Sequence, residues 1–98
     1  MLPDAISEAA IFSLGSVVAT PNALGLLEQH SIAPLSLLKR HAAGDWGDVA
    51  ADDARANQDA LKFGCRLLSS YRIATDARIW IITEADRSVT TLLLPSDY

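Results

Sequence analysis

Three runs in the last third of the chain have the patterns of strands: residues 66–73 alternate between apolar and polar side chains, and residues 78–83 and 89–94 are largely apolar. The runs are rich in β-branched and aromatic side chains, which is typical of β-strands. Short polar segments at residues 74–77 and 84–88 separate them, and Pro95 follows the last run. The pattern therefore predicts a three-stranded antiparallel meander over residues 65–98.

The middle of the chain carries the spacing and the start signals of helices. Thr20 followed by Pro21 predicts an N-cap and a first helical residue. Pro34 starts a second helix, which ends in three consecutive basic residues. A turn rich in glycine and aspartate at residues 44–48 precedes a third helix. That helix should end before Gly64, which suits the left-handed position after a helix.

The N-terminal part is less regular. Residues 6–14 predict a short amphipathic helix, and residues 16–19 predict a small strand or an extended lead-in. The fold class that follows is α+β, in a single domain spanning residues 1–98. We expect three or four short helices packed on one face of the meander. Its parts are an N-terminal helix or arm (1–14), a helical part (20–64) and the antiparallel sheet (65–98).

Composition supports one compact domain, because 50% of the 98 residues are hydrophobic and 20% are charged. The formal net charge of −4 opposes broad attraction to nucleic acid or to an anionic membrane, so we expect neither partner. No apolar run approaches the ~20 residues that span a bilayer. The beginning of the chain does not resemble a signal peptide. We therefore expect a cytoplasmic protein.

A single cysteine, Cys65, excludes an internal disulfide framework and fits a reducing compartment. We expect it to be a small buried residue.

Four groups of residues carry a resemblance to a known family. They are His41-x-x-Gly44-Asp45-Trp46-Gly47-Asp48, Asn57-x-x-Ala60-Leu61, Ser70-Tyr71 and the segment from Trp80 to Pro95. From Val17 onward, the chain resembles small bacterial proteins that are carried by plasmids, phages and integrated elements. These proteins are usually described as plasmid-related or hypothetical. The resemblance implies a mobile-element setting and supplies no chemistry.

Asp45, Asp48, Asp52 and Asp53 form an acidic cluster near His41. Oxygen ligands suit Mg²⁺ or Ca²⁺, and a nearby histidine suits a transition metal. The spacing, however, lacks the alternating ligands and the terminal glutamate of a calcium-binding loop. Aspartates at a turn and at a helix N-terminus are explained by capping and by the helix dipole. We therefore expect no metal and no other cofactor.

Trp46 lies in the turn between two glycines, and it has two interpretations. Its indole could be an exposed anchor for a protein partner, because tryptophan is enriched at binding hot spots. It could equally fold back into the core, since the glycines permit a tight turn, and this second interpretation is favoured.

Glu84, Asp86 and Arg87 bring more ionic chemistry to the loop between the last two strands than a turn requires. One hypothesis is a toxin-like ribonuclease site, because RNA cleavage needs a base, an acid and a cation. The acidic charge of the chain argues against it. The alternative is an ion pair within the loop, between Arg87 and one of the two carboxylates.

Strand alternation places Arg78, Trp80 and Ile82 on the sheet face opposite Ile79 and Ile81. If the helices cover the latter face, the former is unusually apolar for a solvated sheet. Either the N-terminal segment or another chain should then cover it. This is the best indication in the sequence of a protein partner or a homodimer.

The sequence thus favours a non-enzymatic protein-binding accessory of a mobile element, such as a counter-defence (anti-CRISPR or anti-restriction) inhibitor that docks on a host protein complex. A toxin-like RNA nuclease centred on the hairpin loop and a structural homodimer are the alternatives. The candidate partner-binding residues are Glu84, Asp86, Arg87, Trp80, Arg78, Trp46, Asp45, Asp48, Asp52 and Asp53.

Overall fold

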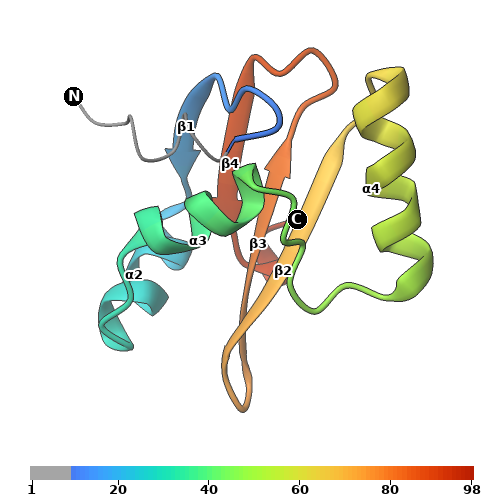
Figure 1. Cartoon of the computed structure of the whole chain (residues 1–98). Coiled ribbons are helices and arrows are strands. Elements are labelled where there is room, and N and C mark those ends of the chain that lie inside the picture. The colour runs from blue at the N-terminus through green and yellow to red at the C-terminus, as the bar shows by residue number, and fades with distance from the viewer. Residues whose placement is uncertain (1–9) are drawn as a thin grey trace.

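The structure is a computed structural model, and it describes residues 10–98. Over this range it contains three α-helices, four strands and one short 3₁₀ helix (Figure 1). The helices are α2 (Pro21–Gln29), α3 (Pro34–Ala42) and α4 (Ala51–Phe63), and the 3₁₀ helix is η1 (Pro95–Asp97). The strands are β1 (Ser16–Ala19), β2 (Leu67–Ala74), β3 (Ala77–Thr83) and β4 (Val89–Leu93). The class is α+β, as predicted.

The four strands form one mixed sheet in the order β1-β4-β3-β2. Strands β2, β3 and β4 pair antiparallel in sequence order, which is the predicted meander. Strand β1 adds a fourth member that pairs parallel with β4, with Val18 beside Thr91. The sequence pattern could not show this pairing, because the two strands lie near opposite ends of the chain.

Local sequence signals set the ends of the helices. The Thr20 hydroxyl oxygen accepts a hydrogen bond from the Ala23 N–H at 3.1 Å, and Pro21 is the first residue of α2. Helix α3 begins at Pro34 without a side-chain cap. Gly64 follows α4 with a φ of 73°, in the left-handed region predicted for it.

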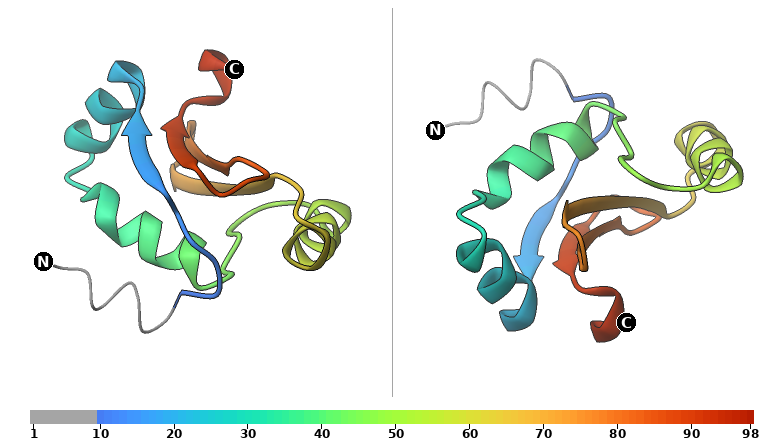
Figure 2. Two further views of the ribbon diagram at one scale, coloured as in Figure 1. Left: turned by 90° about the horizontal axis from the view of Figure 1, so that it is seen from above. Right: turned by 90° about the horizontal axis from the view of Figure 1, so that it is seen from below.

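Two of the three helices cover one face of the sheet, whereas α4 lies beside β2 at the sheet edge (Figures 1 and 2). The main core joins residues of α2 and α3 to the covered face: Ala23, Leu27, Leu37, Leu38, Tyr71, Ile79, Ile81 and Leu92. A second, smaller core joins Ala60 of α4 to Trp46 and Leu67. The expectation that all helices pack on one face is therefore wrong for α4.

The predicted N-terminal helix is wrong over the part of it that the structure describes. Residues 10–14 are irregular, and the rest of the predicted helix lies outside the described residues. The Ile11 N–H donates to the Ala42 carbonyl at 2.8 Å, and the Leu14 carbonyl accepts from the Thr90 hydroxyl at 2.7 Å. These backbone groups bond to α3 and β4, and so they do not close a helical turn.

Strand β2 is the last strand on one side of the sheet. Helix α4 supplies the first hydrogen-bond partner of its outer edge. The Asn57 side chain is buried between α4 and this edge. Its amide nitrogen donates to the Leu68 carbonyl at 2.7 Å, and its amide oxygen accepts from the Leu68 N–H at 3.0 Å. One side chain therefore replaces the two hydrogen bonds that a neighbouring strand would make.

The turn at residues 44–48 completes the same edge. The Ser70 N–H donates to the Trp46 carbonyl at 3.0 Å, and the Ser70 carbonyl accepts from the Asp48 N–H at 2.6 Å. The Arg72 N–H donates to the Asp48 carboxylate at 2.9 Å. Gly47 has a φ of 74°, and a Cβ there would collide with the Ser70 carbonyl. The glycine-aspartate motif is thus the segment that pairs with the edge strand.

Asn57→Ala removes both bonds to the Leu68 backbone and keeps a good helix former at the position. We expect the free energy of unfolding to fall by about 2 kcal/mol, because an N–H and a C=O at the edge lose their partner. Urea denaturation followed by circular dichroism measures the change. Gln58→Ala, at the exposed neighbouring position, is the matched control and should change stability by less than ~0.5 kcal/mol. Equal effects of the two substitutions would contradict the edge-pairing role.

Candidate functional site

A chain of polar side chains runs through the core beneath the sheet. His41, in the last turn of α3, is fully buried. Its Nδ1 lies 2.5 Å from the Ser69 hydroxyl of β2, and its Nε2 lies 2.9 Å from the Thr83 hydroxyl of β3. The Thr83 and Thr90 hydroxyls are 2.7 Å apart, which extends the chain to β4. One imidazole thereby links α3 to three strands of the sheet.

The last acceptor in this series of hydrogen bonds determines which group donates and which accepts in each of them. The Leu14 carbonyl can only accept, so the Thr90 hydroxyl donates to it at 2.7 Å. Thr83 then donates to Thr90, and His41 donates to Thr83 from a protonated Nε2. The unprotonated Nδ1 accepts from the Ser69 hydroxyl. Each group in the chain is satisfied when His41 is neutral.

Burial, and secondarily the positive charge of Arg87, lowers the pKa of His41 from 6.5 to about 4. The imidazole is therefore neutral at pH 7. Two aromatic rings surround it: Phe12 at a centroid distance of 5.1 Å and Trp46 at 5.8 Å. Enclosed in this way, His41 serves the core and is not placed to meet a substrate.

Trp46 is 6% exposed, which places it in the core, the favoured of its two sequence interpretations. Its ring stacks on Phe12 at 6.1 Å. Its indole N–H is buried without a hydrogen-bond partner among the described residues.

Arg87 holds the hairpin loop to the end of α4. Its guanidinium donates to the Cys65 carbonyl at 2.6 Å and to the Ala60 carbonyl at 3.0 Å. It also donates to two carbonyls of its own loop, at Glu84 and Ala85, at 3.1 and 3.2 Å. A cation at the C-terminal end of a helix also complements the helix dipole.

The two carboxylates of the hairpin loop are placed differently from each other. Asp86 accepts from the Ser88 N–H at 3.0 Å and from the Ser88 hydroxyl at 2.6 Å, and these bonds lower its pKa. Asp86 is thus a turn-forming residue. Glu84 is exposed, and no ion pair of Arg87 with either carboxylate is found among residues 10–98. The loop therefore does not assemble a base, an acid and a free cation.

The acidic residues of the 44–48 turn and of α4 also have separate structural roles. The Arg40 Nε lies 2.7 Å from the Asp45 carboxylate, and this hydrogen bond lowers the pKa of Asp45. Asp48 bonds to β2, as described above. Asp52 and Asp53 are exposed in the first turn of α4, where they complement its dipole. Over the described part of the chain, no three His, Cys, Asp or Glu side chains are grouped to hold a metal.

The sheet face opposite α2 and α3, which we call the open face, carries most of the remaining candidate chemistry. Strand register places one row across it, formed by Val18, Thr91, Ile82 and Leu68, and a second row formed by Leu93, Trp80 and Ser70. Ile82, Leu93 and Ser70 of these rows are buried. Trp80 is half-buried, because the Tyr98 ring at the end of the chain packs on it at 5.9 Å. The sequence pattern predicts that the N-terminal segment or another chain covers this face, but part of the cover is the C-terminal segment.

Three arginines lie on the same side of the sheet as these aromatic rings. The Arg66 guanidinium lies 5.7 Å from the centre of the Tyr98 ring. Arg72 and Arg78 are opposite one another in the register of β2 and β3, and Arg78 donates to the Ser70 hydroxyl at 3.1 Å. Asp97 is held elsewhere, by Thr20 and Asn22 at 2.6 and 2.9 Å. The partner-binding residues predicted from the sequence include Trp80 and Arg78. Arg66, Arg72 and Tyr98 are not among them, because their position relative to Trp80 depends on strand register and on the path of the C-terminus.

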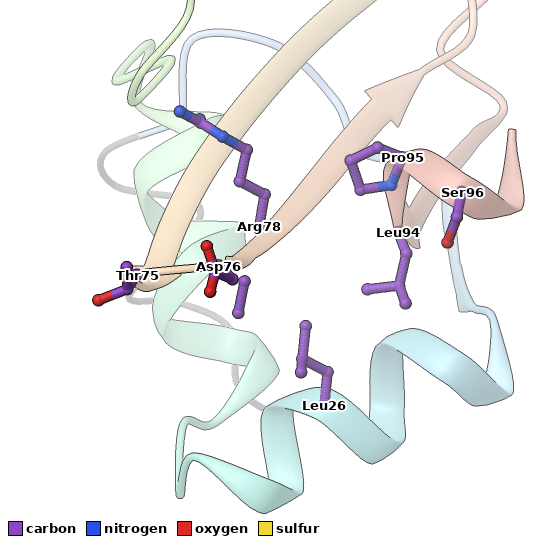
Figure 3. Close-up of a pocket in the computed structure, with 8 residues that line it drawn as sticks. Leu26, Thr75, Asp76, Arg78, Leu94, Pro95 and Ser96 are labelled. Atoms are coloured by element: carbon purple, nitrogen blue, oxygen red, sulfur yellow. The ribbon is translucent and has the colours of Figure 1, made fainter.

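A pocket of about 510 Å³ opens at the far end of the sheet, between α2, the β2–β3 turn and η1 (Figure 3). Leu26 and Leu94 contribute apolar side chains to its lining. The Arg78 guanidinium points away from both of them (Figure 3). Thr75, Asp76 and Ser96 supply the other polar groups of the lining.

Cys65 is exposed, so the expectation of a buried cysteine is wrong. It lies between the end of α4 and the start of β2, where its carbonyl bonds to Arg87.

Among residues 10–98, no helix is long and apolar enough to cross a membrane. Comparison of the chain with known protein families, with curated proteins and with solved structures finds no match.

The pKa of His41 predicts that stability depends on pH in a defined window. The unfolded chain takes up a proton at His41 near pH 6.5, whereas the folded protein resists protonation until about pH 4. Stability should therefore fall by about 3 kcal/mol as the pH decreases from 6.5 to 4. Denaturant titrations across this range measure the loss. Asp45, Asp86 and Asp97 have pKa values below their usual 3.8, so their contributions are lost at lower pH, outside this window.

His41→Gln should flatten the dependence between pH 6.5 and 4. His30→Gln, at the end of α2, is the control and should keep the slope of the wild-type protein. An unchanged slope in His41→Gln would contradict the assignment.

Arg87→Ala tests whether the hairpin loop is structural. We expect a loss of about 2 kcal/mol in the free energy of unfolding, because four carbonyl groups lose a charged donor. Thermal and urea denaturation measure the effect. Glu84→Ala, in the same loop but exposed, should stay within ~0.5 kcal/mol of wild type. An Arg87→Ala protein as stable as wild type would contradict the structural role of Arg87, and its guanidinium would then be a candidate for function.

Proposed function

We propose that the chain is a small non-enzymatic protein-binding accessory of a mobile element, which docks on a host protein complex through its open face. A counter-defence inhibitor, directed against a restriction or CRISPR system, is the specific form of this proposal. The resemblance to plasmid- and phage-borne proteins supplies the setting. The observation that carries the binding role is the combination of Trp80 and Tyr98 with Arg66, Arg72 and Arg78 on one face.

This combination suits an acidic protein surface. Aromatic and arginine side chains are the residues most enriched at binding hot spots. The planar guanidinium donates two parallel hydrogen bonds to a carboxylate, and it also stacks on aromatic rings. Arg66 and Arg72 are exposed, and Tyr98 is 71% exposed, so all three can contact a partner. The net charge of −4 favours a protein over a nucleic acid as the source of the negative charge.

The acidic helix is a weaker candidate for the contact. Asp52, Asp53 and Asp59 of α4 are exposed, but Arg55 and Lys62 are exposed on the same helix. The helix thus carries charge of both signs, whereas a mimic of nucleic acid needs a continuous negative surface. Asp45 and Asp48 are already bonded within the chain.

Charge reversal on the open face is the direct test. A tagged wild-type chain should capture its partner from nuclease-treated host lysate. The double variant Arg66→Glu, Arg72→Glu should capture at least tenfold less of that partner, because the new carboxylates repel an acidic surface. Quantitative mass spectrometry of the captured proteins measures the loss. The matched control is Arg55→Glu, Lys62→Glu, which changes the net charge equally but alters α4. It should retain capture.

Two outcomes would contradict the proposal. Equal loss with both double variants would show that net charge, and not the open face, governs binding. Capture that disappears on nuclease treatment would identify a nucleic acid as the ligand. For the counter-defence form, the measurement is plasmid transformation of cells that carry a restriction or CRISPR system. The wild-type chain and the α4 variant should protect the plasmid, and the open-face variant should not.

A further inference from the structure

The two edges of the sheet are treated in opposite ways. The outer edge of β2 is paired at Leu68, Ser70 and Arg72 by Asn57 and the 44–48 turn. The outer edge of β1 has no such partner within residues 10–98, and β1 ends the strand order. Unpaired edges are sites of strand addition unless charges, prolines or bulges block them. The segment Ser16–Ala19 contains none of these residues.

The backbone of β1 presents alternate groups to this free edge. The N–H groups of Ser16 and Thr20 donate to the Ser88 and Leu92 carbonyls of the β4 side at 2.9 and 3.0 Å. In a strand, successive residues direct their N–H and C=O groups to opposite sides, so Val18 faces β4 as Ser16 and Thr20 do. Val17 and Ala19 therefore hold the outward backbone donors and acceptors.

The side chains at this edge are also unusually apolar. Val17 is 45% and Val18 is 49% exposed. Exposed apolar side chains beside an unpaired edge mark an interaction site.

We infer that β1 pairs antiparallel with β1 of a second copy, which joins the two sheets into one continuous sheet around a two-fold axis. The outward groups fix the register. Val17 of one chain forms a hydrogen-bonded pair with Ala19 of the other, and Val18 faces Val18 across the axis in a non-hydrogen-bonded pair. The valines at the axis lie on the open face, beside Thr91.

A second copy fits this edge for three reasons. The pairing is self-complementary, because each chain supplies the same outward donors and acceptors. The segment is uncharged, so two copies meet without repulsion at the contact even though each carries a net charge of −4. The opposite edge of each sheet is already paired, so assembly stops at two chains and does not continue into a fibre. This inference does not depend on the proposed function.

The full chain should therefore have twice its 10.5 kDa mass in solution by light scattering and sedimentation. Val17→Pro tests the edge itself, since proline removes the outward N–H and leaves the bonds of Ser16 and Thr20 to β4 intact. This variant should have the mass of a single chain. Val17→Thr keeps the N–H and should remain dimeric. Circular dichroism establishes that both variants are folded.

Cysteine crosslinking tests the register in a Cys65→Ser background. Residues facing each other in a non-hydrogen-bonded pair have Cα atoms about 4.5 Å apart, within the range of a disulfide. Val18→Cys should therefore give a covalent dimer on mild oxidation. The two copies of residue 17 are offset diagonally by about 7–8 Å, so Val17→Cys should give at least tenfold less.

A wild-type chain of single mass overturns the inference, whether the edge is then free or covered by residues 1–9 of the same chain. A dimer that survives Val17→Pro overturns it as well, because the contact then lies elsewhere. Crosslinking that is stronger at position 17 than at position 18 overturns the proposed pairing.

Discussion

The hydrogen bonds along the outer edge of β2 are the constraint on which much of this small fold depends. An edge strand leaves every second N–H and C=O without a partner, and residues 10–98 contain no further strand to add there. Asn57 and the 44–48 turn supply those partners. To do so, the turn must follow the strand closely, which explains the left-handed Gly47, and α4 must lie beside the sheet and not above it. The most distinctive motif of the sequence is thus an element of the architecture.

The polar chain around His41 provides a second constraint within the core. An apolar side chain in place of the imidazole would leave the hydroxyls of Ser69 and Thr83 without this partner. A buried network of this kind favours one arrangement of α3 over the strands, because a shifted helix would leave several groups unpaired. The same network makes acid a destabilising condition, since a charged imidazole cannot be solvated there.

With these groups committed to the fold, two surfaces stand out as available. The open face combines aromatic rings with arginines, although the chain as a whole is acidic. The outer edge of β1 is apolar and unpaired within the described residues, in contrast to the other edge. Val18 lies on the open face at this edge, so a two-fold pairing would place two open faces side by side. The hairpin loop contributes little to either surface, because Arg87 and Asp86 bond within it and to α4.

The sequence by itself determined the local elements: the three strands of the meander, the starts of α2 and α3 at Thr20-Pro21 and Pro34, and the left-handed Gly64. These follow from side-chain periodicity and from capping, which act over a few residues. The tertiary structure decided everything that depends on contacts between distant segments. It placed β1 beside β4 and α4 at the edge, joined His41 to Ser69 and Thr83, and assigned Arg87 to backbone carbonyls. The sequence alone does not distinguish a carboxylate or guanidinium that faces solvent from one that completes a hydrogen bond. The partner of such a group is determined by tertiary packing.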